Sequence, residues 1–170
     1  RINRTLAKAQ NGPDWPKTFV HRSANFEVTT DIDQKTCREA ALILEQSFLA
    51  YVDGLTKIKD TESKRFRVFL FSGEAGYKRY IDDVLGGEMP IHTAGIYSRT
   101  LKQLLIWNLP DRDAMMRTVR HEGFHQYLDR VMRDPPIWFN EGMAEYYETA
   151  RYVENRWRIG GVRDDHLKSL

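Results

Sequence analysis

The sequence predicts a single α+β domain in which helices pack on a mixed β-sheet. Three observations support this prediction. The chain has 170 residues, enough for one domain with a core; 41% are apolar and 29% charged; and strand-like and helix-like segments alternate along it. The expected order is strand, helix, strand, helix, two strands and two helices. No repeat or linker interrupts it, so we divide the chain into an irregular lead-in at 1–17 and one domain at 18–170.

Strands and helices alternate in the first half of the domain. Short runs rich in aromatic and β-branched residues predict strands, and longer runs with apolar residues at helical spacing predict helices. These segments are strands at 26–30 and 65–71 and helices at 33–52 and 73–85. Asp31 or Asp33 is the expected N-cap of the first helix, and Gly86-Gly87 ends the second.

The second half contains two strands and then two helices. The sequence predicts strands at 93–97 and 101–107, joined by a short turn, and helices at 111–132 and 139–153. The first of these helices ends before Pro135-Pro136, because proline disfavours continuation of a helix.

A pentapeptide whose side chains can bind a metal or transfer protons lies in the helix at 111–132. Residues 121–125 read His-Glu-Gly-Phe-His. Four residues span little more than one helical turn, so His121 and His125 project from one face and can ligate one Zn²⁺. Glu122 lies about 100° around the helix, where its carboxylate can reach a metal-bound water. The spacing predicts two zinc ligands and a general base for attack by a zinc-activated water. The alternative is two buried histidines satisfied by hydrogen bonds.

A catalytic zinc ion needs a third protein ligand and an open fourth position. The next helix carries Glu141 and Glu145 one turn apart, and carboxylates at that spacing repel each other unless something offsets their charge. We assign Glu141 to zinc and Glu145 to a ligand histidine, whose metal-binding tautomer it would hold. The small residues Gly142 and Ala144 would let the two helices approach closely. The alternative is that both glutamates lie on a solvated face.

The two segments together, H-E-x-x-H and W-F-N-E-G-x-A-E-Y, resemble the gluzincin zinc metallopeptidases. Among these, the likeness is to small bacterial peptidase-MA-like domains that share the second segment. The resemblance implies a zincin-type H-E-x-x-H helix followed by a ligand helix, and one Zn²⁺ per chain. It implies His121, His125 and Glu141 as metal ligands and Glu122 as catalytic base. It also implies Glu145 as the acidic residue that lies behind the ligands and holds one of the histidines.

The family's pattern also suggests how substrate is held. A strand at the edge of the cleft would pair with an extended peptide through backbone hydrogen bonds, and Ala94-Gly95 would allow close approach. The alternative is an ordinary sheet strand. The expected edge-strand residues are Thr93, Ala94 and Gly95, and the candidate oxyanion stabilisers are Tyr146, Tyr152 and His166.

We therefore expect a hydrolase: a zinc-dependent peptidase acting on a peptide or protein substrate. The aminopeptidase signature Gly-Ala-Met-Glu-Asn is absent, which favours an endopeptidase. The alternative is a zinc-bearing scaffold or binding module with little turnover, since larger relatives continue beyond Glu141 into a second subdomain. Hydrolysis of a non-peptide substrate is a third hypothesis.

Composition limits the other classes of partner. A net charge of +2 with interspersed signs does not favour nucleic acid, and no apolar run approaches the ~20 residues that a membrane span needs. Cys37 is the single cysteine, which excludes an internal disulfide. The chain opens at Arg1, from which we expect a fragment or processed form of a longer protein. The family resemblance leans toward an exported or periplasmic protein, and the residues leave the oligomeric state open.

Overall fold

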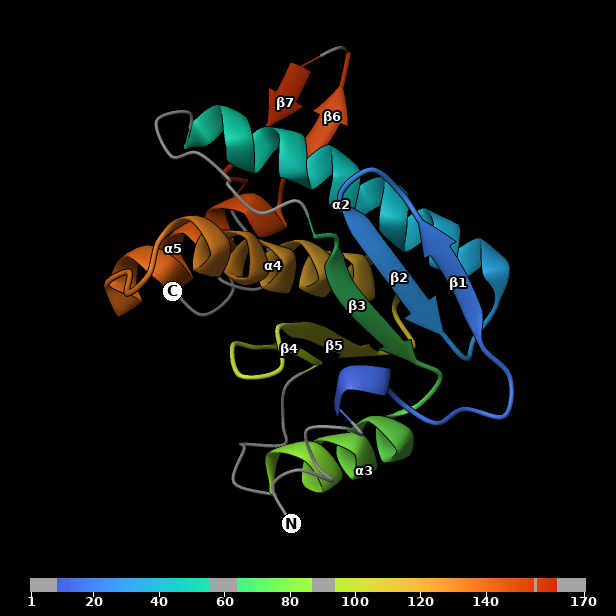
Figure 1. Ribbon diagram of the computed structural model, residues 1–170. Coiled ribbons are helices and arrows are strands. Elements are labelled where there is room, and N and C mark those ends of the chain that lie inside the picture. Colours follow the sequence, from blue (N-terminus) through green and yellow to red (C-terminus); the bar gives the residue numbers. More distant parts are fainter. Residues whose placement is uncertain (1–8, 56–63, 87–93, 155, 162–170) are drawn as a thin grey trace, which may run out of the picture.

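The chain folds around a five-stranded mixed sheet (Figure 1). The computed structural model describes residues 9–55, 64–86, 94–154 and 156–161. The strand order is β1-β2-β3-β5-β4, where β2, β3 and β5 run parallel and β1 and β4 are antiparallel edge strands. The strands are β1 (Phe19–Arg22), β2 (Phe26–Thr30), β3 (Phe66–Phe71), β4 (Gly95–Ser98) and β5 (Gln103–Trp107).

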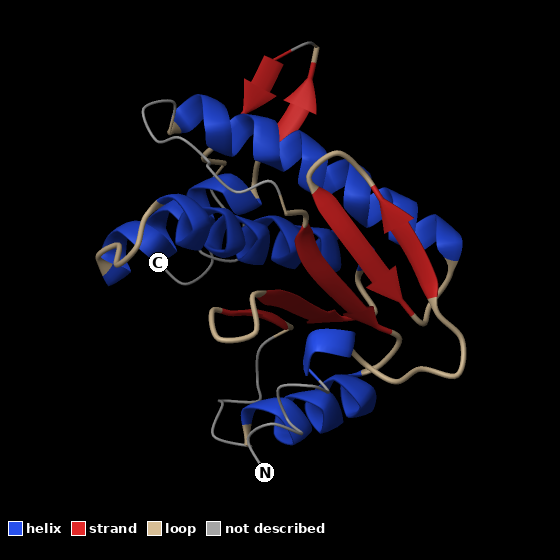
Figure 2. Cartoon of the chain, viewed as in Figure 1, coloured by secondary structure: helices blue, strands red, loops and turns tan. Residues whose placement is uncertain are grey.

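Helices cover both faces of the sheet (Figure 2). Successive side chains of a strand point to opposite faces, and β3 shows how this builds two cores. Phe66, Val68 and Leu70 pack with α2 (Gln34–Gly54), α4 (Arg112–Val131) and α5 (Ile137–Glu148) on one face. Phe69 and Phe71 pack with α3 (Glu74–Leu85) on the other. The predicted α+β class with a mixed sheet is therefore confirmed.

Local sequence signals mark where three of the helices begin or end. The Asp33 side chain accepts a 2.6 Å hydrogen bond from the backbone N–H of Thr36, which makes it the N-cap of α2. Gly86 ends α3 in the left-handed conformation that glycine favours, with φ of 77°. The helix α4 ends at Val131, before the two prolines as predicted.

Four features differ from the sequence-based expectations. Strand β1 is absent from the prediction, and residues 9–11 are helical within a lead-in predicted to be irregular. The helix α5 begins at Ile137 and ends at Glu148, and the predicted last turn is instead part of a two-stranded hairpin. The hairpin strands are β6 (Arg151–Val153) and β7 (Arg156–Arg158). All of these segments are short, so tertiary contacts rather than periodicity determine them.

The edge strand β4 lies against α4, and Gly95 permits this close approach. A Cβ at that position would lie 2.8 Å from Cγ1 of Ile106 and 2.9 Å from Cγ2 of Thr118 on α4. The helix that carries the H-E-x-x-H segment therefore runs beside β4, the outermost strand on this side of the sheet within the described ranges. None of the helices in the described ranges combines the length and apolar character that crossing a bilayer requires.

Candidate metal centre

Three side chains converge where α4 and α5 pack together. Oε2 of Glu141, in the first turn and a half of α5, lies 3.7 Å from Nε2 of His121 and 3.6 Å from Nε2 of His125. All three potential ligand atoms lie within 4.8 Å of one another. The structure therefore brings together the residues that the sequence predicts as ligands.

The spacing of these atoms can be compared with the geometry that zinc requires. Two ligand atoms about 2.1 Å from a tetrahedral ion lie about 3.4 Å from each other. The two distances from Glu141 to the histidines, 3.7 and 3.6 Å, exceed this by a few tenths of an ångström. Two imidazole nitrogens and one carboxylate oxygen also form a donor set that zinc accepts. The donor set and these two distances are therefore compatible with a zinc ion held by three protein ligands.

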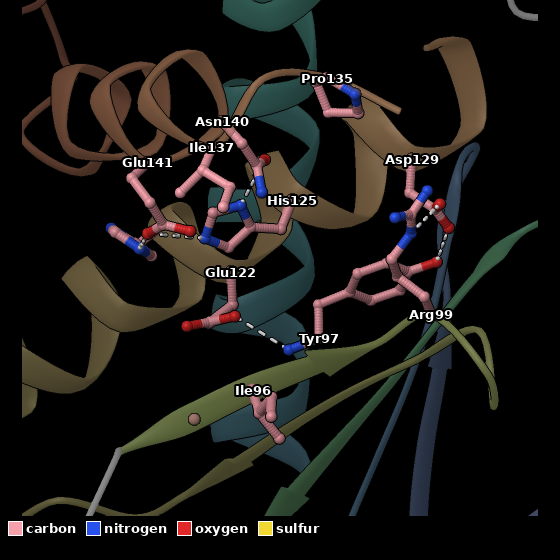
Figure 3. A pocket seen from close by; sticks show the side chains of 12 residues that line it. Ile96, Tyr97, Arg99, Glu122, His125, Asp129, Pro135, Ile137, Asn140 and Glu141 are labelled. Atoms are coloured by element: carbon pink, nitrogen blue, oxygen red, sulfur yellow. Dashed lines mark hydrogen bonds and ion pairs between the residues drawn. The ribbon is translucent and has the colours of Figure 1, made fainter. Parts of the chain in front are cut away.

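The other ring nitrogen of each histidine is held by an oxygen from α5. Nδ1 of His121 lies 3.1 Å from Oε2 of Glu148. Nδ1 of His125 lies 2.8 Å from Oδ1 of Asn140 (Figure 3). An acceptor at Nδ1 keeps the proton on that nitrogen and leaves the Nε2 lone pair toward Glu141. These contacts favour, in both rings, the tautomer and orientation that a metal ligand needs.

The prediction that Glu145 holds a ligand histidine is wrong. Glu145 is exposed, and both Nδ1 atoms have the partners named above, Glu148 and Asn140. The reason is the direction of the two helices: α5 runs back along α4, so the end of α5 meets the earlier histidine. Glu148 lies seven residues after Glu141, two turns along the helix and about 20° from it around the axis, whereas Glu145 lies about 40° from Glu141 in the other direction.

Glu122 reaches from α4 to the edge strand (Figure 3). Its Oε2 accepts a 2.9 Å hydrogen bond from the backbone N–H of Tyr97 on β4. This bond fixes the carboxylate, and Oε1 accepts no hydrogen bond from the described residues. Glu122 therefore lies beside the three converging side chains without joining them, as the predicted base should.

Burial dominates the protonation of this site. It raises the pKa of Glu122 to about 8, with the Tyr97 hydrogen bond opposing the rise and the charge of Glu141 adding to it. Burial also lowers the pKa of His125, aided by His121 and opposed by the contacts with Asn140 and Glu141. The metal-free chain thus favours a neutral His125, which is the form that binds metal.

A pocket of about 470 Å³ opens over the converging side chains. It extends along β4 toward Arg99, where Asp129 accepts hydrogen bonds from Nε of Arg99 and from the hydroxyl of Tyr97. The residues that line it are Gly95, Ile96, Tyr97, Arg99, His121, Glu122, His125, Asp129, Pro135, Ile137, Asn140 and Glu141. A second pocket, of about 250 Å³, shares Gly95, His121 and Glu122 with the first. The centre thus lies in the middle of a cleft.

The remaining predicted residues have different outcomes. Gly95 begins the edge strand β4, and Ala94 precedes it and lines the second pocket. Tyr146 and Tyr152 are exposed and absent from the lining of either pocket; the Tyr146 ring lies where a Cβ on Gly160 would be, and Tyr152 packs on Trp157. The positions found do not support either tyrosine as an oxyanion stabiliser. Thr93 and His166 lie outside the described residues.

Sequence reasoning missed Asn140 and Glu148. Asn140 directly precedes Glu141, and an amide side chain next to a predicted ligand is a signal that could have identified it. Glu148 follows Glu141 by seven residues, a spacing that also returns to the same face of a helix. Comparison of the chain with protein-family models and with curated proteins finds no match in either case.

Proposed function

We propose that this chain is a zinc-dependent peptidase of the gluzincin type that cleaves within peptide chains. One observation carries the proposal: His121, His125 and Glu141 converge in a cleft beside Glu122, which is held by the sheet edge and not by the ligand set. A purely structural zinc site has closed coordination and no use for a neighbouring base. An open fourth position beside a carboxylate is the arrangement of a hydrolytic site.

Each residue then has a separate task. A bound zinc ion would supply a Lewis acid that lowers the pKa of water and polarises a carbonyl. His121, His125 and Glu141 would hold it, while Glu148 and Asn140 keep the two rings in the ligating tautomer. Glu122, fixed by the Tyr97 backbone N–H, would accept the proton of the attacking water and pass it to the departing amine nitrogen.

The shape of the cleft supports an endopeptidase. The pocket toward Arg99 and the pocket toward Ala94 share residues at the metal centre, so the cleft continues on both sides of it. A substrate can therefore extend away from the centre in both directions. Among the described residues β4 is the outermost strand on this side of the sheet, and apart from the Tyr97 N–H, which donates to Glu122, its outward-facing backbone groups are available to an extended peptide that adds as a further strand.

The scaffold hypothesis retains one supporting observation. Neither Tyr146 nor Tyr152 lies at the cleft, so the described residues do not include the oxyanion donor that the sequence predicts. Loss of one such donor typically lowers turnover by about 10²–10³-fold. A chain with a complete metal site and no such donor would bind zinc and turn over slowly, which is the alternative that the next experiment addresses.

The test is the substitution Glu122→Gln in zinc-loaded protein. The glutamine keeps the size of the side chain and can still accept the Tyr97 hydrogen bond, but it cannot accept a proton. We expect zinc content and circular dichroism to stay unchanged and cleavage of a peptide library, mapped by mass spectrometry, to fall by about 10²–10⁴-fold.

The matched control is Glu145→Gln, because Glu145 is exposed on α5 and outside the cleft lining. It should cleave like the wild type. Chelator-sensitive cleavage that survives in Glu122→Gln would refute the role of this residue. A wild-type protein that binds zinc and cleaves nothing would favour the scaffold.

A further inference from the structure

Arg117 is a cationic side chain in the cleft that neither the ligand set nor the base requires. It lies on α4 one turn before His121 and lines the 250 Å³ pocket together with Gly95, His121, Glu122 and Glu148. The guanidinium makes no hydrogen bond or ion pair with any described residue. An arginine with five N–H donors in a concave site is suited to an anionic group of a ligand.

The two acidic side chains that line this pocket with Arg117 are already engaged. Glu148 holds Nδ1 of His121, and Glu122 accepts from the backbone of Tyr97. The arginine at the opposite end of the cleft differs in this respect, because Nε of Arg99 donates to Asp129 at 2.8 Å. Arg117 is thus the cleft arginine, among the described residues, whose donors are all left for a ligand.

The direction of the edge strand β4 indicates on which side of the scissile bond Arg117 lies. Ala94 accepts from Trp107 on β5, whereas Tyr97 turns its N–H toward the cleft. Because the hydrogen-bonding groups of an edge strand alternate, Gly95 also turns its backbone outward. Antiparallel pairing is commoner and slightly stronger than parallel pairing, so an added peptide should run opposite to β4. Its carboxyl-terminal part then lies toward Gly95 and Arg117.

We propose that Arg117 binds a carboxylate on the carboxyl-terminal side of the scissile bond, so that the substrate is a peptide with an acidic group at that place. This inference rests on the proposed function and adds its substrate class. The carboxylate has two sources, an acidic side chain or the free carboxyl terminus. A guanidinium binds either through two parallel, charge-assisted hydrogen bonds, which a neutral amide cannot form.

The experiment measures binding, so it does not depend on turnover. The probes are three peptide hydroxamates that chelate zinc and extend two residues toward the carboxyl-terminal side. One ends in a free carboxylate, one ends in an amide, and one carries an aspartate side chain and an amide end. Their affinities for zinc-loaded wild type, Arg117→Met and Arg38→Met are measured by calorimetry. Arg38 is exposed on α2 and serves as the matched control.

We expect wild type and Arg38→Met to bind at least one carboxylate probe about ten-fold more tightly than the neutral probe. Arg117→Met should lose this preference and keep its affinity for the neutral probe. The probe that loses affinity identifies the source: the free terminus or the acidic side chain.

The opposite results are equally distinct. A wild type that does not discriminate, a preference that survives in Arg117→Met, or equal weakening of all three probes would overturn the proposal. Tight, discriminating binding by a protein that cleaves nothing would support Arg117 and count against the peptidase. Zinc-loaded protein that binds no hydroxamate would overturn both, because the metal would then have no accessible position.

Discussion

The protonation and direction of single side chains determine whether the three converging residues can hold a metal ion. Nε2 of each histidine is available because Nδ1 contacts an oxygen of α5, from Glu148 or from Asn140. The relative placement of His121, His125 and Glu122 could be predicted because it is set within one helical turn. The partners of Nδ1 depend on how α4 and α5 cross. The spacing of residues within either helix does not predict how the two helices cross.

The correction at Glu145 can be tested with a pair of alanine substitutions. Glu148→Ala removes the oxygen 3.1 Å from Nδ1 of His121 and should lower zinc affinity by about 10–100-fold. Glu145→Ala changes an exposed side chain with no described contact to either histidine and should leave the affinity unchanged. Competition with a chromophoric chelator measures both. A larger loss in Glu145→Ala than in Glu148→Ala would restore the sequence-based assignment.

At the scale of elements, the site depends on how closely α4 approaches the edge of the sheet. Long helices and apolar strands could be predicted because their periodicity extends over many residues, as in α2 and β3. The short strands β1, β6 and β7 could not, since three or four residues define no period. The expectation that Gly142 lets α5 approach α4 is also wrong, because a Cβ there would meet nothing within 4 Å.

Substitution by alanine should change the free energy of unfolding in opposite directions at Gly95 and at Gly142. In Gly95→Ala the new Cβ meets Ile106 and Thr118 at 2.8 and 2.9 Å and the backbone oxygen of Leu105 at 3.1 Å. The strand or α4 must shift, which should cost about 1–3 kcal/mol of unfolding free energy. Gly142→Ala adds a methyl group in open space within a helix and should stabilise by up to about 1 kcal/mol. Urea denaturation compares them, and destabilisation by Gly142→Ala would contradict this account of the packing.

At the scale of the whole molecule, the candidate centre brings together α4 and α5, which a short turn connects, and the edge strand β4, which β5 separates from them in the sequence. His121 and His125 belong to α4, Glu141 to α5, and the base is tied to β4 by Tyr97. The core on this face of the sheet contains residues of α2, α4 and α5. A ligand that links α4 to α5 therefore acts on the same cooperative unit that holds β4 in place.

Zinc should accordingly stabilise the folded chain through mass action. A metal that binds only the folded state contributes about 2.7 kcal/mol when its free concentration is 100 times the dissociation constant. For a domain of this size we expect the thermal midpoint to rise by roughly 5–10 °C with zinc and to return with chelator, as measured by scanning calorimetry. Glu122→Gln should keep this response, because its side chain is not a ligand. His125→Ala should lose it, since removal of one of the three ligands leaves the ion weakly held. If zinc raised the midpoint of His125→Ala as much as that of the wild type, the ion would bind elsewhere and the assignment of His121, His125 and Glu141 would fail.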